Sequence, residues 1–351
     1  MNIIENDLYK SQINKYANLP LDWDKLSNSS VLISGATGLI GSFLTDIIMK
    51  KNEEGLNCKI YALALYEKEF DSRFNLYLNN DNFVPYACDV TKSLPQLGKI
   101  DYIFHLASNT SPLLYVTNPI KTITTNFIGM MNLLEYAARC NTKRVLFGSS
   151  VEIYGQNRGD VDYFDEDYCG YLNSNTLRAS YPESKRITET LCHAYIQEKD
   201  LDIVITRIAR AFGPTMFISD TKAISQFLMN GVRSEDIILK SKGDQLYSFM
   251  YVGEVVSGIL WTFFYGQKGE AYNISYKDYD IRLIDFANII ADYCSTKVIF
   301  DLPTQKEAEG YSKVTKALLN SDKLQKLGWS PLFNIKESIE STIDVLKFLY
   351  N

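Results

Sequence analysis

Tyr181 and Lys185 stand four residues apart in the sequence YPESK, and their types and spacing are suited to proton transfer. Residues four apart share one face of a helix. A nearby ammonium group lowers the pKa of a tyrosine hydroxyl below its usual value of about 10, so the pair could deprotonate an alcohol. The same spacing also occurs by chance on many helices, so the interpretation depends on the elements that would position the two residues.

Three glycines stand between an expected strand and an expected helix. Residues 30–34 (SVLIS) form a short apolar run, GATGLIG follows, and the next residues have apolar positions at helical spacing. Glycine lets the backbone turn tightly and approach a pyrophosphate, which then lies at the helix N-terminus. The turn therefore predicts a dinucleotide site formed by Gly35, Thr37, Gly38, Leu39, Ile40 and Gly41.

A third feature follows the same order along the chain. The segment FGSSVEIYG stands at the end of an expected strand and contains Ser150, thirty-one residues before Tyr181. A strand-end serine can hydrogen-bond the substrate oxygen that a tyrosine also reaches. A glycine turn, this serine and Y-x-x-x-K in this order favour a catalytic role for Ser150, Tyr181 and Lys185.

Apolar runs alternate with helical patterns along the first 213 residues. Further strands are expected at 59–66, 101–107, 143–150 and 201–209. The alternation predicts an α/β fold with a Rossmann-type, doubly wound parallel sheet. We expect three parts: an N-terminal helical extension (1–28), a dinucleotide-binding domain with the Ser/Tyr/Lys set (29–213), and a smaller α/β region (214–351) that mainly binds the substrate.

The composition narrows the class of protein. The 351 residues are 46% hydrophobic and 22% charged, as in ordinary globular proteins. A net charge of −6 argues against nucleic acid or an anionic membrane as partner, and no apolar run is long enough to span a bilayer. Six scattered cysteines predict reduced thiols in the cytoplasm, and two histidines make a metal site unexpected. The acidic run at 162–168 is expected to be a solvated loop.

The choice between NAD and NADP depends on the end of the second strand. An acid there binds the adenosine ribose, whereas a basic residue accepts a 2′-phosphate. The position falls at Leu65, and Glu67 and Lys68 beyond it indicate opposite cofactors. Both cofactors stay open, with NAD favoured through Glu67. Asp89, after the third strand, is a candidate for binding the adenine amino group.

The sequence resembles the extended short-chain dehydrogenase/reductases that modify nucleotide sugars, the NAD-dependent epimerase/dehydratase family. The resemblance covers residues 29 to about 345 and includes HLAS, SSVEIYG, YPESKR, FMYVGEVVSG and LGW. Within the family, NPIKT, LRASYPESKRITETLCHAY and FGPTM are most similar to segments of UDP-glucuronate decarboxylases. The resemblance therefore implies a nucleoside-diphosphate sugar as substrate.

The resemblance also implies a mechanism. Tyr181, as a phenolate, takes a proton from a sugar hydroxyl, expected to be that on C4, while NAD(P) takes hydride from the same carbon. Lys185 stabilises the phenolate, lowers its pKa and holds the nicotinamide ribose, and Ser150 orients the reacting oxygen. The further cofactor-binding residues implied are Val90, Leu106, Ala107, Ser108, Asn126 and Ile208.

The two residues after Ser150 indicate the subclass. Dehydratases of this family carry Asp-Glu there, whereas this chain has Val151 and Glu152, so epimerisation or decarboxylation is expected and 4,6-dehydration is not. Decarboxylases keep a glutamate at the position of Glu152, so the resemblance implies a catalytic role for Glu152. Arg210 replaces a family asparagine, and Thr215 and Tyr247 replace family arginines. We hypothesise that Arg210 binds the diphosphate, helped by Lys222, Arg178 or Lys240. The expected substrate-binding residues are Ser111, Tyr115, Ser150, Val151, Glu152, Arg178, Arg210, Lys222 and Tyr247.

Two other functions stay open on the sequence. A net reductase would consume NAD(P)H on a nucleotide-linked keto sugar or ketose, and a regulator would bind dinucleotide without turnover. The family resemblance further implies a homodimer formed through helices at 119–140 and 181–198. Leu134, Leu191 and Tyr195 on these helices are consistent with a dimer interface and with an intramolecular core.

Overall fold

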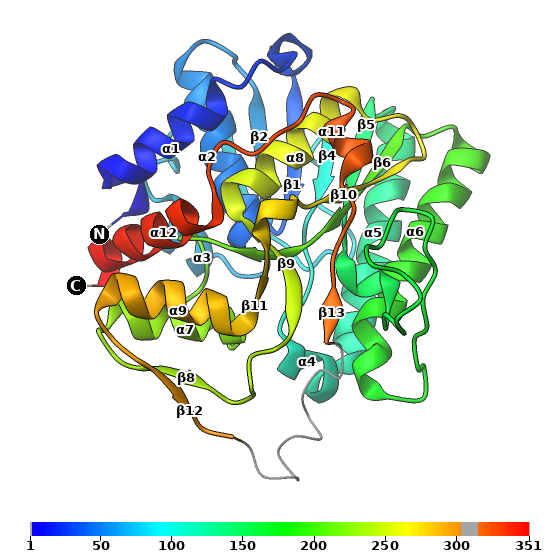
Figure 1. Cartoon of the computed structure of the whole chain (residues 1–351). Helices are drawn as coiled ribbons and strands as arrows, with labels where there is room; N and C mark the ends of the chain where they lie inside the picture. The colour runs from blue at the N-terminus through cyan, green and yellow to red at the C-terminus, as the bar shows by residue number, and fades with distance from the viewer. Residues whose placement is uncertain (1, 303–314, 351) are drawn as a thin grey trace.

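Seven parallel strands form the central sheet of the computed structural model, which describes residues 2–302 and 315–350. The strand order is β10-β6-β5-β4-β1-β2-β3, so the chain winds outward in both directions from β1. The Rossmann-type, doubly wound fold is confirmed (Figure 1). The strands are β1 (Ser30–Ser34), β2 (Lys59–Ala64), β3 (Phe83–Ala87), β4 (Tyr102–His105), β5 (Arg144–Ser150), β6 (Ile203–Ile208) and β10 (Ala271–Ile274).

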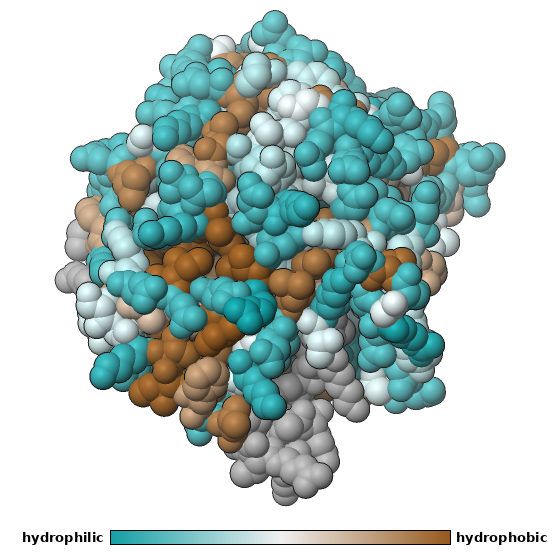
Figure 2. Space-filling model, viewed as in Figure 1, coloured by the Kyte–Doolittle hydropathy of each residue, from teal (hydrophilic) through white to brown (hydrophobic). Residues whose placement is uncertain are grey.

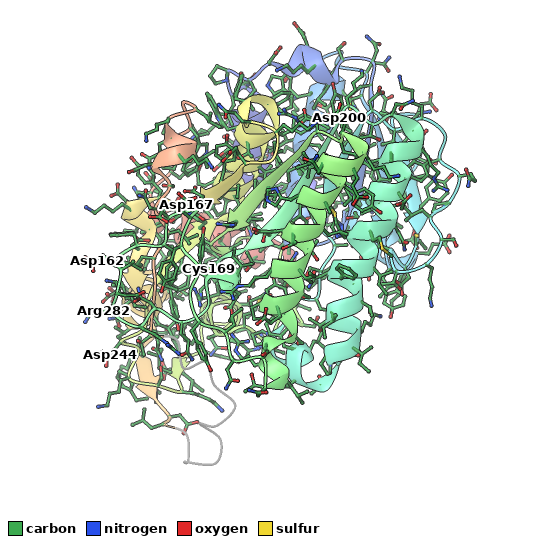
Figure 3. The ribbon with its side chains drawn as sticks, turned by 90° about the vertical axis from the view of Figure 1, so that its right-hand side faces the viewer. Asp162, Asp167, Cys169, Asp200, Asp244 and Arg282 are labelled. Carbon is green, nitrogen blue, oxygen red and sulfur yellow. The ribbon has the colours of Figure 1, made fainter. Side chains whose placement is uncertain are left out.

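Helices cover both faces of this sheet, which is why its strands are almost wholly apolar. One face packs against α2 (Leu39–Glu53) and α8 (Val252–Tyr265). The other packs against α5 (Pro119–Cys140) and α6 (Ser180–Lys199), which lie side by side in Figure 3. The sequence placed α5 correctly because a proline begins it and Asn141, in the left-handed conformation, ends it.

The residues considered for a dimer interface lie mostly inside the protein. Leu134 is buried, Leu191 and Tyr195 pack against the core between α5, α6 and the sheet, and the Tyr195 hydroxyl donates to Glu135 at 2.5 Å. Other apolar side chains on these two helices are exposed, among them Ile120, Ile123 and Ile187.

The C-terminal half forms a smaller α/β region and also returns to the central sheet. A second sheet contains β7 (Arg210–Phe212), β9 (Leu246–Tyr251), β11 (Asp280–Arg282) and β13 (Lys316–Ala317). Residues 252–274 leave it to supply α8 and β10 to the central sheet. The remaining elements are β8 (Ile237–Leu239), β12 (Val298–Phe300), α7 (Ala223–Val232), α9 (Leu283–Cys294), α11 (Asp322–Gln325) and α12 (Ile335–Tyr350).

The N-terminal extension contains the expected helix, α1 (Asp7–Ala17), which connects the two halves. Tyr9 donates to Asp46 of α2 at 2.6 Å, and Tyr16 donates to Glu254 of α8 at 2.8 Å. Tyr251, the last residue of β9, donates to Gln12 at 2.6 Å. The extension therefore fastens the helix after the glycine turn to the C-terminal region.

The acidic segment at 162–168 is not a solvated loop throughout, which corrects the expectation. Asp162 and Asp167, which are labelled in Figure 3, are exposed, but Phe164 is fully buried. Glu166 accepts the backbone N–H of Asn273 at 2.8 Å. The aromatic residues between the acids anchor the loop beside β10.

Polar side chains dominate the face shown in Figure 2, where apolar side chains gather toward its lower left. Ile238, Ile299, Phe300 and Leu302 on or after the paired strands β8 and β12 are exposed apolar residues. Within residues 2–302 and 315–350, no helix combines the length and the hydropathy needed to cross a membrane.

Candidate active site

The glycine turn between β1 and α2 leaves no room for side chains. Gly35 has φ +70°, and a Cβ there would lie 2.8 Å from the Cα of Ala107. A Cβ on Gly41 would lie 2.2 Å from the carbonyl oxygen of Gly35. Gly38 precedes α2 without a side-chain cap, so the first N–H groups of the helix are left for an anion. The turn fits a pyrophosphate.

The ends of β1, β4 and β5 meet at the carboxyl edge of the sheet beside this turn. Ser34 bonds the Nδ1 atom of His105 at 2.7 Å and accepts the N–H of Leu106 at 3.2 Å. Burial lowers the pKa of His105 to about 3, so its ring is neutral. Ile208 stands opposite Ser150 in the register of β5 and β6. Val90 packs closely against α5, because a Cβ placed on Gly129 would lie only 2.7 Å from the Cγ2 atom of Val90.

Two acids expected to bind the adenosine half lie in different surroundings. Asp89 accepts two bonds from Thr91, at 2.8 and 3.0 Å. Partial burial raises its pKa, but Thr91 and two nearby lysines outweigh this, so the pKa lies below its usual value. Glu67 is exposed and makes no side-chain hydrogen bond with any described residue. The neighbouring Glu69 instead reaches the glycine turn, where it accepts from Thr37 at 2.6 Å.

Tyr181, Lys185 and Ser150 come together where the N-terminal turn of α6 meets the end of β5. Tyr181 is buried and shares hydrogen bonds with Ser150 and Ser108. The Lys185 ammonium lies 5.8 Å from the centre of the Tyr181 ring and donates to the Gly148 carbonyl at 2.7 Å. Asn126 of α5 braces this end of α6, because it accepts from Ser108 and donates to Ser184, each at 2.8 Å.

The expected lowering of the tyrosine pKa by Lys185 is not what the structure shows. Burial raises the pKa of Tyr181 to about 12, and the bonds from Ser150 and Ser108 offset this only in part. Burial also lowers the pKa of Lys185 to about 7, against the opposing effect of Glu189. The lysine bonds a backbone carbonyl instead of the phenol, so desolvation dominates for both groups.

Glu189 is a residue that the sequence-based prediction did not identify. It stands four residues after Lys185 on the same helix, is buried, and accepts from Ser149 at 2.5 Å. Arg207 of β6 pairs with it at 2.7 Å. The signal was present in the i,i+4 spacing from Lys185. This network fixes α6 against β5 and β6, and with it the position of Lys185.

A group of charged side chains lies beside Tyr181. Glu152 pairs with Arg178 at 3.2 Å through one oxygen and with Arg210 at 3.6 Å through the other. Arg210 stacks over the Tyr247 ring at 3.7 Å, and Arg178 lies 5.5 Å from the centre of the Tyr115 ring. Among the described atoms, the buried Nη1 of each arginine has no hydrogen-bond partner. One carboxylate with two guanidiniums leaves a net positive charge.

Tyr115 links this charged group to Tyr181. It belongs to α4 (Pro112–Thr117), and its ring stacks on that of Tyr181 at 4.5 Å with an angle of 10°. Ser111 bonds Thr221 at 3.1 Å, and Lys222 donates to Thr110 at 3.3 Å, so these two residues join the segment before α4 to the start of α7. Val151 is buried and apolar.

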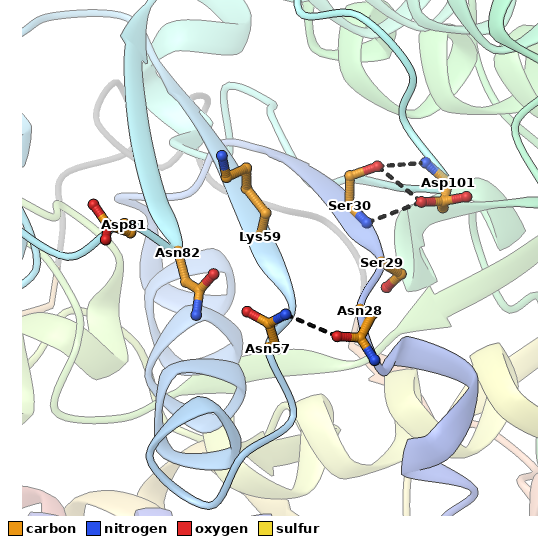
Figure 4. Close-up of a pocket in the computed structure, with 8 residues that line it drawn as sticks. All are labelled: Asn28, Ser29, Ser30, Asn57, Lys59, Asp81, Asn82 and Asp101. Carbon is orange, nitrogen blue, oxygen red and sulfur yellow. Dashed lines mark hydrogen bonds between the residues drawn. The ribbon is translucent and has the colours of Figure 1, made fainter.

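A separate polar pocket lies at the opposite, amino edge of the sheet (Figure 4). Its side chains bond one another: Asn57 donates to Asn28 at 2.8 Å, and Ser30 donates to Asp101 at 3.0 Å. In open α/β sheets, ligands bind at the carboxyl edge. The pocket therefore belongs to the framework of the strands.

Comparisons with known proteins agree with this geometry. Residues 31–275 match the model of the NAD dependent epimerase/dehydratase family. The chain is 31% identical over 320 residues to UDP-glucuronic acid decarboxylase 5 of Arabidopsis thaliana, covering 89% of this chain and 88% of that protein. It is 30% identical over 316 residues to UDP-glucuronic acid decarboxylase 1 of Xenopus tropicalis, covering 89% and 71%.

A solved structure confirms the fold. UDP-glucuronic acid 4-epimerase from Bacillus cereus, in complex with UDP-glucuronic acid and NAD, matches with a TM-score of 0.76 and 20% identity. The match covers 92% of this chain and all of that one. The chain belongs to the NAD dependent epimerase/dehydratase family of nucleotide-sugar enzymes.

Proposed function

We propose that this enzyme transiently oxidises C4 of a nucleoside-diphosphate sugar that carries a carboxylate, leading to decarboxylation or epimerisation. The observation that carries the proposal is the Arg178–Glu152–Arg210 group, which lies one aromatic ring away from Tyr181. The names of the related decarboxylases and of the epimerase complex support an acidic sugar. We propose NAD as the cofactor, reduced and reoxidised within each turnover.

The dinucleotide would lie on the glycine turn and along the carboxyl edge of the sheet. Gly35 and Gly41 keep side chains out of the turn, and the N-terminus of α2 offers N–H groups to the pyrophosphate. Asp89 would bind the adenine amino group, and Lys185 the nicotinamide ribose. When bound, NAD⁺ supplies a hydride acceptor and a positive charge that favours ionisation of the tyrosine.

Tyr181 would accept the proton of the C4 hydroxyl while Ser150 orients the oxygen. Because burial holds the tyrosine pKa at about 12, the charge of the bound cofactor and of protonated Lys185 must stabilise the phenolate. Once protonated, Tyr181 would donate to the C4 ketone oxygen. The same proton returns when C4 is reduced at the end of the cycle.

The arginines would bind the sugar carboxylate. Oxidation at C4 makes a carboxylate on C5 a β-keto acid, so breaking the bond from C5 to the carboxylate carbon releases CO₂ and leaves an enolate that Tyr181 can protonate on oxygen. A proton from water would then add to C5 while Tyr181 takes back the enol proton, which restores the C4 ketone that accepts the returning hydride. Epimerisation would need only rotation of the keto sugar before hydride returns. Each oxygen of Glu152 pairs with an arginine. The geometry of Glu152 therefore fits a role in positioning Arg178 and Arg210 better than a role in proton transfer.

The buried Val151 supports the exclusion of 4,6-dehydration, because its side chain has no proton to donate to a leaving hydroxyl. We further propose a homodimer formed through α5 and α6, supported by their exposed isoleucines at positions 120, 123 and 187.

The test is to denature freshly purified protein and to identify the nucleotide released. About one equivalent of NAD⁺ plus NADH per chain is expected, because a cofactor restored in every cycle need not leave. Protein that is empty when purified, and that consumes added NAD(P)H stoichiometrically with a keto sugar, would support a net reductase instead.

A further inference from the structure

The choice between NAD and NADP depends on what occupies the space beside the adenosine ribose. This space lies between the glycine turn and the end of β2, where the two are tied together by the N–H of Ala36, which donates to the Leu63 carbonyl at 3.0 Å. The usual acidic position at the strand end is Leu65, which is exposed. A different side chain must therefore fill the role.

Glu69 is the acid that reaches this space. It stands in the first turn of α3 (Lys68–Phe74) and accepts a hydrogen bond from the Thr37 hydroxyl at 2.6 Å. Thr37 is itself buried within the glycine turn. The carboxylate is thus held over the loop that binds the dinucleotide, whereas Glu67 points to no described partner.

A buried ion pair fixes α3 in this position. Arg73, one helical turn after Glu69, pairs with Asp46 of α2, which also accepts from Tyr77 at 3.1 Å. Tyr9 of the N-terminal helix completes the group, since it donates to Asp46 at 2.6 Å. Because Asp46 is fully buried and Arg73 is only 13% exposed, α3 cannot shift away from α2 without leaving a charge unpaired.

We infer that Glu69 selects NAD over NADP in this enzyme, a conclusion that rests on the dinucleotide site of the proposed function. A carboxylate can accept hydrogen bonds from the 2′- and 3′-hydroxyls of the NAD ribose. The 2′-phosphate of NADP would face this negative charge at close range in a partly desolvated site, where like charges repel strongly. The N-terminal extension contributes by holding α3, through Tyr9.

The test is equilibrium binding of NADH and NADPH, followed by nicotinamide fluorescence, to protein freed of bound nucleotide. Wild type is expected to bind NADH at least about tenfold more tightly than NADPH. Glu69→Gln, which keeps the shape of the side chain, should reduce this ratio by about tenfold. Glu67→Gln removes the same charge two residues away and should leave the ratio unchanged.

An unchanged ratio in Glu69→Gln, or a change produced by Glu67→Gln instead, would overturn the inference. If wild type bound both nucleotides equally while sugar turnover persisted, the inference that Glu69 selects NAD would be wrong, but the proposed function would stand. If no variant bound either nucleotide, the proposed function would fail with it. For a variant that unfolds when its nucleotide is removed, mass spectrometry of the nucleotide that copurifies gives the same comparison. NAD alone is expected with wild type and with Glu67→Gln, and both NAD and NADP are expected with Glu69→Gln.

Discussion

Tyr181→Phe is expected to lower kcat by about 10³-fold with the substrate affinity nearly unchanged, because general acid–base catalysis contributes about 10²- to 10⁴-fold. The substitution removes only the phenolic oxygen that is proposed to take the C4 proton. The ring and its stacking on Tyr115 at 4.5 Å stay in place. Turnover of the nucleotide sugar and binding of the sugar by calorimetry would be measured together.

Tyr195→Phe provides the matched control, since it removes a hydroxyl from the same helix that bonds Glu135 outside the site. This control should keep wild-type turnover. A Tyr181→Phe enzyme with more than about a tenth of wild-type kcat would contradict the catalytic role. A regulator that binds dinucleotide without chemistry would show no turnover in either protein.

Arg210→Met is expected to weaken binding of UDP-glucuronic acid by about 10- to 100-fold, as hydrogen bonds to charged groups contribute about 1.5–3 kcal/mol. The affinity for UDP should stay the same if the arginine binds the sugar carboxylate. Equal losses for both ligands would instead assign Arg210 to the diphosphate, as the sequence-based hypothesis held. Calorimetric titration with each ligand separates the two roles.

The double substitution of Arg178 and Arg210 by Met would leave Glu152 as an unpaired, partly buried charge, so it should be combined with Glu152→Gln. Lys316→Met is the matched control, because Lys316 pairs with Asp162 on an exposed part of the surface. This control should bind both ligands as wild type does.

The sequence predicted the central sheet well because its signals are local. Apolar runs, the glycine turn and the proline that begins α5 each specify an element without reference to distant residues. No local sequence pattern indicates that the chain returns to this sheet through α8 and β10, because the order of the strands depends on tertiary packing. The buried Phe164 within an acidic loop was missed for the same reason.

Within the site, the order of Ser150, Tyr181 and Lys185 was readable, whereas their protonation was not. Desolvation depends on which side chains enclose a group, and here it outweighs the lysine charge at Tyr181. Glu69 was missed because the prediction considered only residues near the end of the strand, whereas the first turn of α3 brings Glu69, two residues after Glu67, to Thr37. Arg178 and Arg210 were predicted to bind an anion, but their shared contact with Glu152 could not be predicted because it depends on the tertiary structure.

The most direct measurement is proton NMR of UDP-glucuronic acid incubated with the purified protein and NAD⁺. The proposed function predicts conversion to a UDP-pentose with release of CO₂, or to the C4 epimer, without net accumulation of NADH. UDP-glucuronic acid that stays unchanged over many hours with protein shown to hold NAD would contradict the acidic-sugar assignment. Accumulation of one NADH per sugar would contradict the closed redox cycle.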